Sequence, residues 1–120
     1  MTLVDTSVWV EHLRQGNARL ARLLEGGDVV AHPYVVGELA LGDLPRREVV
    51  LADLLNLPAA AVATPAEVLA FTQRQRLYGR GIGFVNAALM ASAALTPGTA
   101  LWTHDRRLRA VAAELGLAAA

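Results

Sequence analysis

Three acidic residues, Asp5, Glu38 and Asp105, each follow a short apolar run of the chain. Asp5 comes after the apolar pair Leu3-Val4, which is typical of a short buried strand, and two hydroxyl residues follow it. In open α/β sheets, ligands bind beyond the carboxyl ends of the strands. The repeated arrangement therefore predicts that these carboxylates lie at one edge of a sheet, where they could act on a common ligand.

Each candidate also has a purely structural interpretation. Aspartate is a preferred N-cap residue, so Asp5 and Asp105 could simply cap the helices that follow them. Glu38 lies in an apolar helical stripe, where a carboxylate must be exposed, paired or bound to a metal. Asn86 is an amide on an apolar helix, which needs hydrogen-bond partners or a place at the helix start. Together, three carboxylates and an amide are hard oxygen ligands that suit Mg²⁺ or Mn²⁺, ions that serve phosphoryl chemistry.

The elements that would position these residues alternate between short strands and helices. Strands are expected at residues 3–4, 28–31, 60–63, 100–102 and 117–118, and helices at about 8–14, 18–25, 33–41, 45–56, 65–77, 84–95 and 106–115. A capping box of Thr64 and Glu67 marks the start of one helix. This alternation predicts an α/β fold with three layers, α/β/α, around a short parallel sheet of four or five strands. We expect residues 1–120 to form one domain.

Composition narrows the class of protein. The chain is 54% hydrophobic and 18% charged, with zero formal net charge and no cysteine. The absence of cysteine excludes a disulfide scaffold and a thiolate metal site, and it fits a cytoplasmic protein. Zero net charge argues against binding nucleic acid by bulk electrostatics alone. The apolar surplus favours a partner protein or a dimer.

The remaining candidates are basic residues and histidines. Arg74, Arg76 and Arg80 lie before or within a glycine-spaced segment, residues 78–83, and could contact phosphate or form the solvated face of a helix. That segment lacks the ending of a P-loop. The three histidines have no metal-binding spacing, so we interpret them as structural groups or as supports of the site. No serine lies in a nucleophile elbow, which disfavours a hydrolase triad.

Four segments of the chain resemble the PIN-domain ribonucleases, and within them the VapC toxins of bacterial toxin–antitoxin pairs. They are Leu3-Val4-Asp5-Thr6-Ser7-Val8-Trp9, Val36-Gly37-Glu38-Leu39, Phe84-Val85-Asn86-Ala87-Ala88-Leu89 and Leu101-Trp102-Thr103-His104-Asp105-Arg106-Arg107-Leu108. The first and last segments are the most specific, because their order and spacing both match. The resemblance covers essentially the whole chain and implies a PIN-like fold.

The resemblance also implies a site and a reaction. Asp5, Glu38, position 86 and Asp105 would surround Mg²⁺ or Mn²⁺, and Thr6 and Thr103 would be supporting hydroxyls. The implied reaction is endonucleolytic hydrolysis of RNA by metal-activated water, without a covalent intermediate. The implied partners are a VapB-type antitoxin, which blocks the site, and a second copy of the toxin.

Position 86 departs from the family pattern, which has aspartate where this chain has Asn86. Asparagine keeps the shape and one carbonyl oxygen but removes a negative charge. We therefore expect weaker metal binding and impaired catalysis in this form. Natural divergence and a deliberate inactivating substitution both fit the asparagine, and the intact state of the other three positions favours the second.

Two other functions fit parts of the sequence. The chain could be a binding module that carries no catalysis and acts only through an antitoxin, which the apolar surplus favours. It could also be a receiver-like or phosphatase domain, because an aspartate at the end of a first strand occurs there too. A receiver would need a lysine near a late strand, and this chain has no lysine.

Overall fold

A three-stranded parallel sheet forms the centre of the protein, for which a computed structural model describes residues 1–120. The strands are β1 (Thr2–Val4), β2 (Val29–Val30) and β3 (Ala100–Trp102), in the order β2-β1-β3. Leu3 of β1 pairs with Val30 on one side and with Leu101 on the other. The first strand of the chain is therefore the central strand, and its carboxyl end lies between those of its two neighbours.

The sheet has fewer strands than the four or five that the sequence predicts. Residues 60–63 and 117–118 are not strands, so those two predictions are wrong. Each edge of the sheet carries only an isolated bridge instead, from Ala31 to Ala59 and from Leu101 to Ala118. The apolar, alanine-rich segments do reach the sheet edges, but each pairs at one residue and then leaves the edge.

Seven helices connect and cover these strands. They are α1 (Thr6–Gln15), α2 (Ala18–Glu25), α3 (Pro33–Ala40), α4 (Arg47–Leu55), α5 (Pro65–Gln75), α6 (Phe84–Leu95) and α7 (Arg106–Glu114). Two predicted helices have the expected bounds, and α4 begins later than expected because residues 42–46 form a loop. The predicted capping box is present, with reciprocal hydrogen bonds between Thr64 and Glu67.

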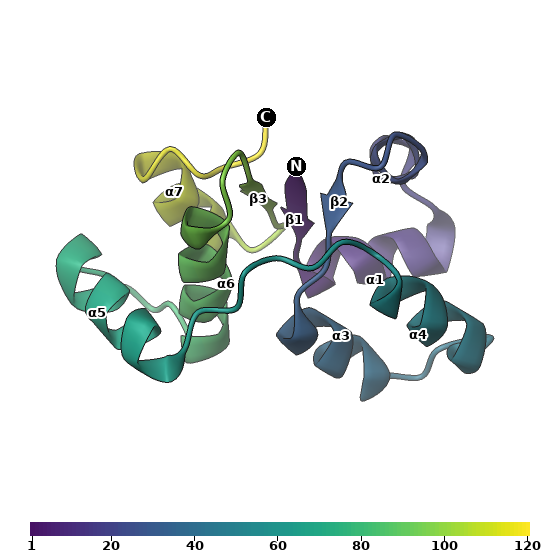
Figure 1. Ribbon diagram of the computed structural model, residues 1–120, viewed down its shortest axis with the longest axis horizontal. Coiled ribbons are helices and arrows are strands. Elements are labelled where there is room, and N and C mark those ends of the chain that lie inside the picture. Colours follow the sequence, from purple (N-terminus) through teal and green to yellow (C-terminus); the bar gives the residue numbers. More distant parts are fainter.

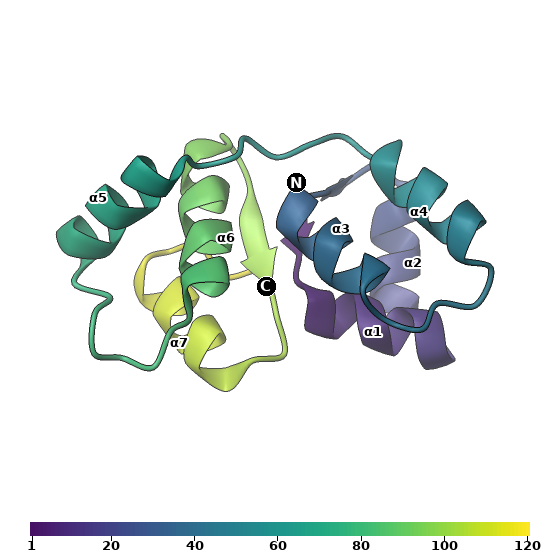
Figure 2. The ribbon, with the colours of Figure 1, turned by 90° about the horizontal axis from the view of Figure 1, so that it is seen from below.

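The helices flank the sheet as two groups. Helices α1 to α4 lie on the β2 side, and α5 to α7 lie on the β3 side (Figure 1). Helices α1, α3 and α7 each begin directly after a strand, so their N-termini lie at the carboxyl edge of the sheet. Helix α6 packs against β3 and precedes it through a short turn, which brings the start of α6 to the same edge (Figure 2).

Helix α6 is the most deeply buried helix of the protein. Residues 87–93 are all buried, and most of them are alanine. A helix that is apolar all round belongs inside a protein, and small side chains let its neighbours approach closely. Leu3, Leu89 and Leu101 are among the fully buried residues around it. None of the seven helices combines the length and apolar character that a membrane crossing requires.

A buried histidine joins three parts of the fold. His32 is the N-cap of α3, and its Nδ1 accepts a hydrogen bond from the Tyr34 N–H at 3.1 Å. Because Nδ1 is an acceptor, Nε2 carries the proton and donates to Ser92 Oγ of α6 at 3.0 Å. Ser92 Oγ also accepts from the Ala63 N–H at 3.1 Å. Burial lowers the pKa of His32, which favours the neutral imidazole.

Candidate active site

Asp5 lies at the carboxyl end of β1 with its side chain buried. It occupies the N-cap position of α1, but its carboxylate makes no capping hydrogen bond. Instead, Oδ2 accepts hydrogen bonds from Ser7 Oγ at 3.0 Å and from Thr103 Oγ1 at 2.7 Å. The capping interpretation therefore explains the position of Asp5 but not the orientation of its side chain.

Thr103 connects Asp5 to the second acidic residue. Its buried hydroxyl donates to Asp5 and accepts from the Asp105 N–H at 3.0 Å. Asp105 in turn caps α7, because its Oδ1 accepts from the Leu108 N–H at 2.9 Å. The structural interpretation of Asp105 as an N-cap is thus confirmed, yet it uses only one of the two carboxylate oxygens.

Thr6, the residue after Asp5 in the chain, binds the third acidic residue. Thr6 Oγ1, on the first residue of α1, donates a hydrogen bond of 2.6 Å to Glu38 Oε1 of α3. Glu38 is exposed, as its structural interpretation predicts. Two hydroxyls, those of Thr6 and Thr103, therefore tie the surroundings of Asp5 to the helices that carry the other two acids.

Asn86 lies at the same edge of the sheet as the three acids, but it takes no part in the hydrogen bonds that join their surroundings. It lies half-buried in the first turn of α6, consistent with the helix-start interpretation, and it makes no hydrogen bond to the three acids. Among the three arginines predicted to contact RNA, Arg80 forms a bidentate ion pair with Glu114 of α7, at 2.7 and 2.8 Å. This hydrogen bonding raises the pKa of Arg80 and lowers the pKa of Glu114.

The other two arginines differ in their positions. Arg74 lies on the exposed surface of α5, and Arg76 ends that helix in a left-handed conformation with φ of 54°. Neither Arg74, Arg76 nor Arg80 pairs with the acids of the candidate site. The chain has no lysine, and none of its arginines forms an ion pair with Asp5, Glu38 or Asp105.

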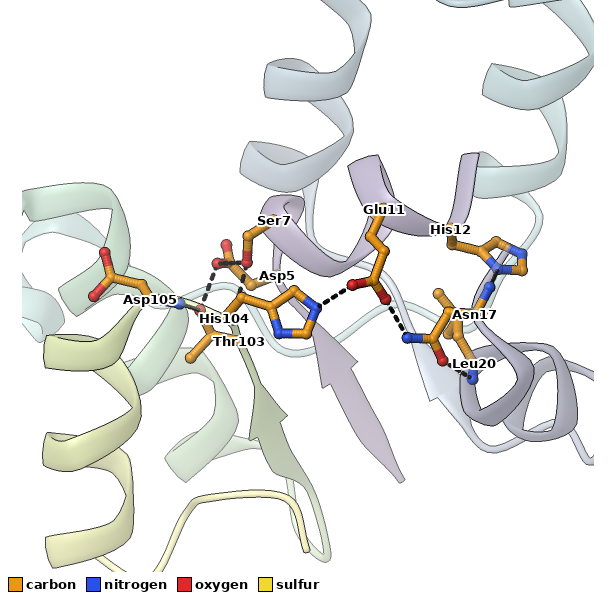
Figure 3. Close-up of polar contacts among 9 residues, drawn as sticks. All are labelled: Asp5, Ser7, Glu11, His12, Asn17, Leu20, Thr103, His104 and Asp105. Carbon is orange, nitrogen blue, oxygen red and sulfur yellow. Dashed lines mark hydrogen bonds and ion pairs between the residues drawn. The ribbon is translucent and has the colours of Figure 1, made fainter. Parts of the chain in front are cut away.

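Sequence reasoning gave no role to two residues beside the acids, Ser7 and Glu11. Ser7 bridges Asp5 Oδ2 and the His104 N–H, and the His104 ring pairs with Glu11 of α1 at 3.2 Å (Figure 3). The interpretation of His104 as a supporting group is consistent with these contacts. One signal was available, because Ser7 and Glu11 are four residues apart and share a face of one helix.

The donor set fits a hard divalent cation by its chemistry. Asp5 Oδ1, Glu38 Oε2 and Asp105 Oδ2 accept no hydrogen bond from the protein. Because no buried polar side-chain atom lacks a partner, these free oxygens reach solvent. The acids stand apart, however, since no three acidic or histidine side chains lie close enough to share one ion. The residues present therefore supply suitable ligands and uncompensated charge in an open arrangement.

Comparison with known proteins identifies the family. A sequence model of the PIN domain matches residues 2–114, which is nearly the whole chain. The chain belongs to the PIN-domain family. The resemblance that the sequence shows to this family is thereby confirmed, as is the expected α/β fold.

Similar proteins narrow the position of this chain within the PIN-domain family. It is 52% identical over 120 residues to Ribonuclease VapC32 of Mycobacterium tuberculosis, in two strains, covering 100% of this chain and 97% of the relative. The predicted similarity to VapC proteins is therefore confirmed. Its fold also matches the crystal structure of FitAcB from Neisseria gonorrhoeae, with a TM-score of 0.64, 23% identity and 94% coverage of each chain.

Proposed function

We propose that this PIN-domain protein is a metal-dependent endoribonuclease toxin of a toxin–antitoxin pair. The observation that carries the proposal is the buried carboxylate of Asp5, held by two hydroxyls at the end of the central strand with one oxygen free. Its 52% identity to a protein named a ribonuclease supports the same activity. The reaction would be hydrolysis of an RNA phosphodiester bond by water.

In this proposal, Asp5 is the central ligand of Mg²⁺ or Mn²⁺, and Glu38, Asp105 and position 86 complete the set. Such an ion activates water and neutralises charge on the phosphate. Ser7 and Thr103 orient the Asp5 carboxylate by binding Oδ2, so that Oδ1 is the oxygen available to a ligand. The cap to Leu108 similarly fixes Asp105, with Oδ2 as its available oxygen.

Asn86 is expected to weaken this site. An amide oxygen is a neutral ligand, so three carboxylates rather than four would hold the ion. We therefore expect Asn86→Asp to bind the divalent ion more tightly and to cleave RNA faster than the chain itself.

The deciding experiment compares RNA cleavage by this chain and by Asn86→Asp, with Mg²⁺ or Mn²⁺ and with chelator. Asp5→Asn in each form is the matched control, since it removes the central ligand and keeps the side-chain shape. Cleavage by the aspartate form that chelator and Asp5→Asn both abolish supports the proposal. Cleavage that persists in chelator contradicts the metal mechanism, and equal cleavage by both forms shows that position 86 is not an essential ligand.

We further propose that a VapB-type antitoxin and a second copy of the chain cover its exposed apolar residues, in a homodimer and a toxin–antitoxin hetero-oligomer. Large apolar side chains are exposed at several places, among them Leu41, Leu55, Leu69 and Phe84. Light scattering of the chain alone and co-expressed with its neighbouring gene product would test this. A monodisperse monomer with no gain from co-expression contradicts it.

A binding module without catalysis is the second candidate function. The asparagine at position 86 and the exposed apolar residues favour it. It predicts that neither this chain nor Asn86→Asp cleaves RNA, while both bind the antitoxin. Under the nuclease proposal, Arg74 and Arg76, which have no ion-pair partner, are available to contact RNA phosphate, whereas Arg80 is paired with Glu114. The binding-module candidate predicts no effect of Arg74 or Arg76 on RNA affinity.

A further inference from the structure

A hydrogen bond and an ion pair, here called the clamp, hold His104 in the loop between β3 and α7 against helix α1. Ser7 Oγ accepts the His104 backbone N–H at 3.1 Å, and Glu11 Oε2 binds the ring Nε2 at 3.2 Å. Ser7 and Glu11 lie one helical turn apart on the same face of α1, so this face of the helix contacts His104 at two points, its backbone N–H and its ring. Figure 3 shows the two contacts side by side.

The clamp lies between buried Asp5 and exposed Asp105 of the candidate site. On one side, Ser7 Oγ donates to Asp5 Oδ2, so the clamp is joined to the central acid. On the other side, His104 separates Thr103 from Asp105, the residue that caps α7. His104 therefore adds a second link between Asp5 and the loop that carries Asp105, beside the hydrogen bonds of Thr103.

Helix α2 supports the clamp from outside the site. The second oxygen of Glu11, Oε1, accepts from the Asn17 side-chain amide, and Asn17 Oδ1 caps α2 through the Leu20 N–H at 3.0 Å. An isolated, partly exposed ion pair is worth little, because water screens it and both side chains lose freedom. Here both oxygens of Glu11 are used and the partner is also held by its backbone, so the pair is preorganised.

We propose that His104 is a positioning residue that, through Ser7 and Glu11, sets the separation of Asp5 and Asp105 for one divalent ion. This inference rests on the proposed function, since it assigns a role toward the same ion. It goes beyond that proposal because Ser7, Glu11 and His104 would not bind the ion themselves. They would act through the loop between β3 and α7. Partners that orient metal ligands commonly change metal affinity by about 10- to 100-fold when they are removed.

The test is titration of the full chain in the Asn86→Asp background with Mn²⁺ alone, followed by calorimetry and without RNA. Glu11→Ala and His104→Ala are each expected to weaken Mn²⁺ binding about tenfold. The double variant should lose little more than either single one, because both changes break the same clamp. Glu25→Ala, which removes an exposed glutamate of α2 with no side-chain partner, is the matched control and should leave the affinity unchanged.

Conservative variants separate positioning from general loss of structure. Glu11→Gln keeps an oxygen that accepts from the His104 ring, and His104→Gln keeps a side-chain N–H donor, so both should restore most of the affinity. Thermal unfolding of every variant, measured in parallel, shows whether the fold is retained. Recovery by the conservative variants at unchanged unfolding temperature supports the proposal.

Two outcomes overturn the inference, and they differ in what they say of the proposed function. If Asn86→Asp binds Mn²⁺ and Glu11→Ala and His104→Ala bind it equally well, the positioning role is wrong and the metal site stands. If Asn86→Asp binds no Mn²⁺ at all, the metal site and the positioning role are both wrong.

Discussion

At Asp5 the two carboxylate oxygens have different surroundings, and this difference defines the residue's chemistry. Oδ2 is occupied by the hydroxyls of Ser7 and Thr103, whereas Oδ1 has no donor from the protein. Hydroxyl donors stabilise a carboxylate without neutralising it, unlike an arginine partner. Oδ1 is therefore the oxygen of this buried acid that a cation from solvent could contact.

Thr103→Val is the sharpest test at the scale of one residue. It keeps the side-chain volume but removes the hydroxyl that bridges Asp5 and Asp105, leaving the Asp105 N–H without that acceptor. We expect a loss of about 1–3 kcal/mol in the free energy of unfolding, measured by urea denaturation. Thr103→Ser should recover most of this loss.

Thr2→Val is the control for that change. Thr2 lies on β1 and its side chain makes no hydrogen bond, so valine, a good strand former, should be neutral there. Equal stability of Thr103→Val and Thr2→Val would contradict the bridging role of Thr103.

At the scale of elements, the strand–helix junctions determine which polar atoms are used for folding and which remain free. Helix α7 uses Asp105 Oδ1 as its cap, and α3 uses the ring of His32 in the same way. Helix α1 begins at Asp5 without a side-chain cap, so its first N–H groups are not satisfied by that carboxylate. The junction after β1 thus forgoes a side-chain cap and leaves Asp5 Oδ1 without a hydrogen bond from the protein.

Asp105 allows the capping role and the proposed ligand role to be separated. Asparagine caps helices as well as aspartate does, so Asp105→Asn should leave stability nearly unchanged while it weakens Mn²⁺ binding. Asp105→Ala removes both roles and should cost about 1 kcal/mol in the free energy of unfolding. Denaturation and calorimetry on the same samples check both effects, and a large loss of stability in Asp105→Asn would contradict the assignment.

At the scale of the whole molecule, His32 joins α3, α6 and the connection between α4 and α5. Because burial lowers the pKa of His32, the unfolded chain takes up a proton near pH 6.5 that the folded chain resists. The stabilisation is present above about pH 6.5 and is lost as the pH falls below it.

We therefore expect His32 to steepen acid destabilisation as the pH falls below about 6.5, by up to about 1.4 kcal/mol per pH unit, the limit for one proton. His32→Asn can still cap α3 but does not titrate, so its free energy of unfolding should be lower at pH 7.5 and should fall less on acidification. Urea denaturation of both proteins at several pH values measures this. Parallel pH profiles would contradict the prediction.

The sequence predicts the fold class and the four candidate residues because both depend on local patterns. Apolar runs that end at Asp5 and Asp105 mark strand ends, and a parallel sheet then brings those ends together. The two predicted outer strands are absent because an alanine-rich run such as residues 60–63 is as apolar as a strand but has one β-branched side chain, Val62, where strands favour several. Whether such a run pairs at one residue or at several is decided by the sheet edge it meets.

The hydrogen bonds of the site could not be predicted in the same way. The contact between Thr103 and Asp5 joins residues 98 positions apart, and no local pattern indicates which of the two carboxylate oxygens accepts it. The contacts of His104 with Ser7 and Glu11 could not be predicted either, because the sequence around a histidine without metal-binding spacing does not indicate its partner. Arg80 was predicted to contact phosphate, but it forms an ion pair with Glu114, a partner that sequence reasoning did not consider.

The placement of β1 at the centre of the sheet has a consequence for synthesis on the ribosome. The strand is made first, but its neighbour β3 and the hydroxyl of Thr103 emerge only when most of the chain has been translated. Domains fold as their segments become available, so the nascent chain holds Asp5 and Glu38 long before Asp105 can join them. A product that terminates before residue 100 would lack β3, Thr103 and Asp105, so it could not assemble the proposed site.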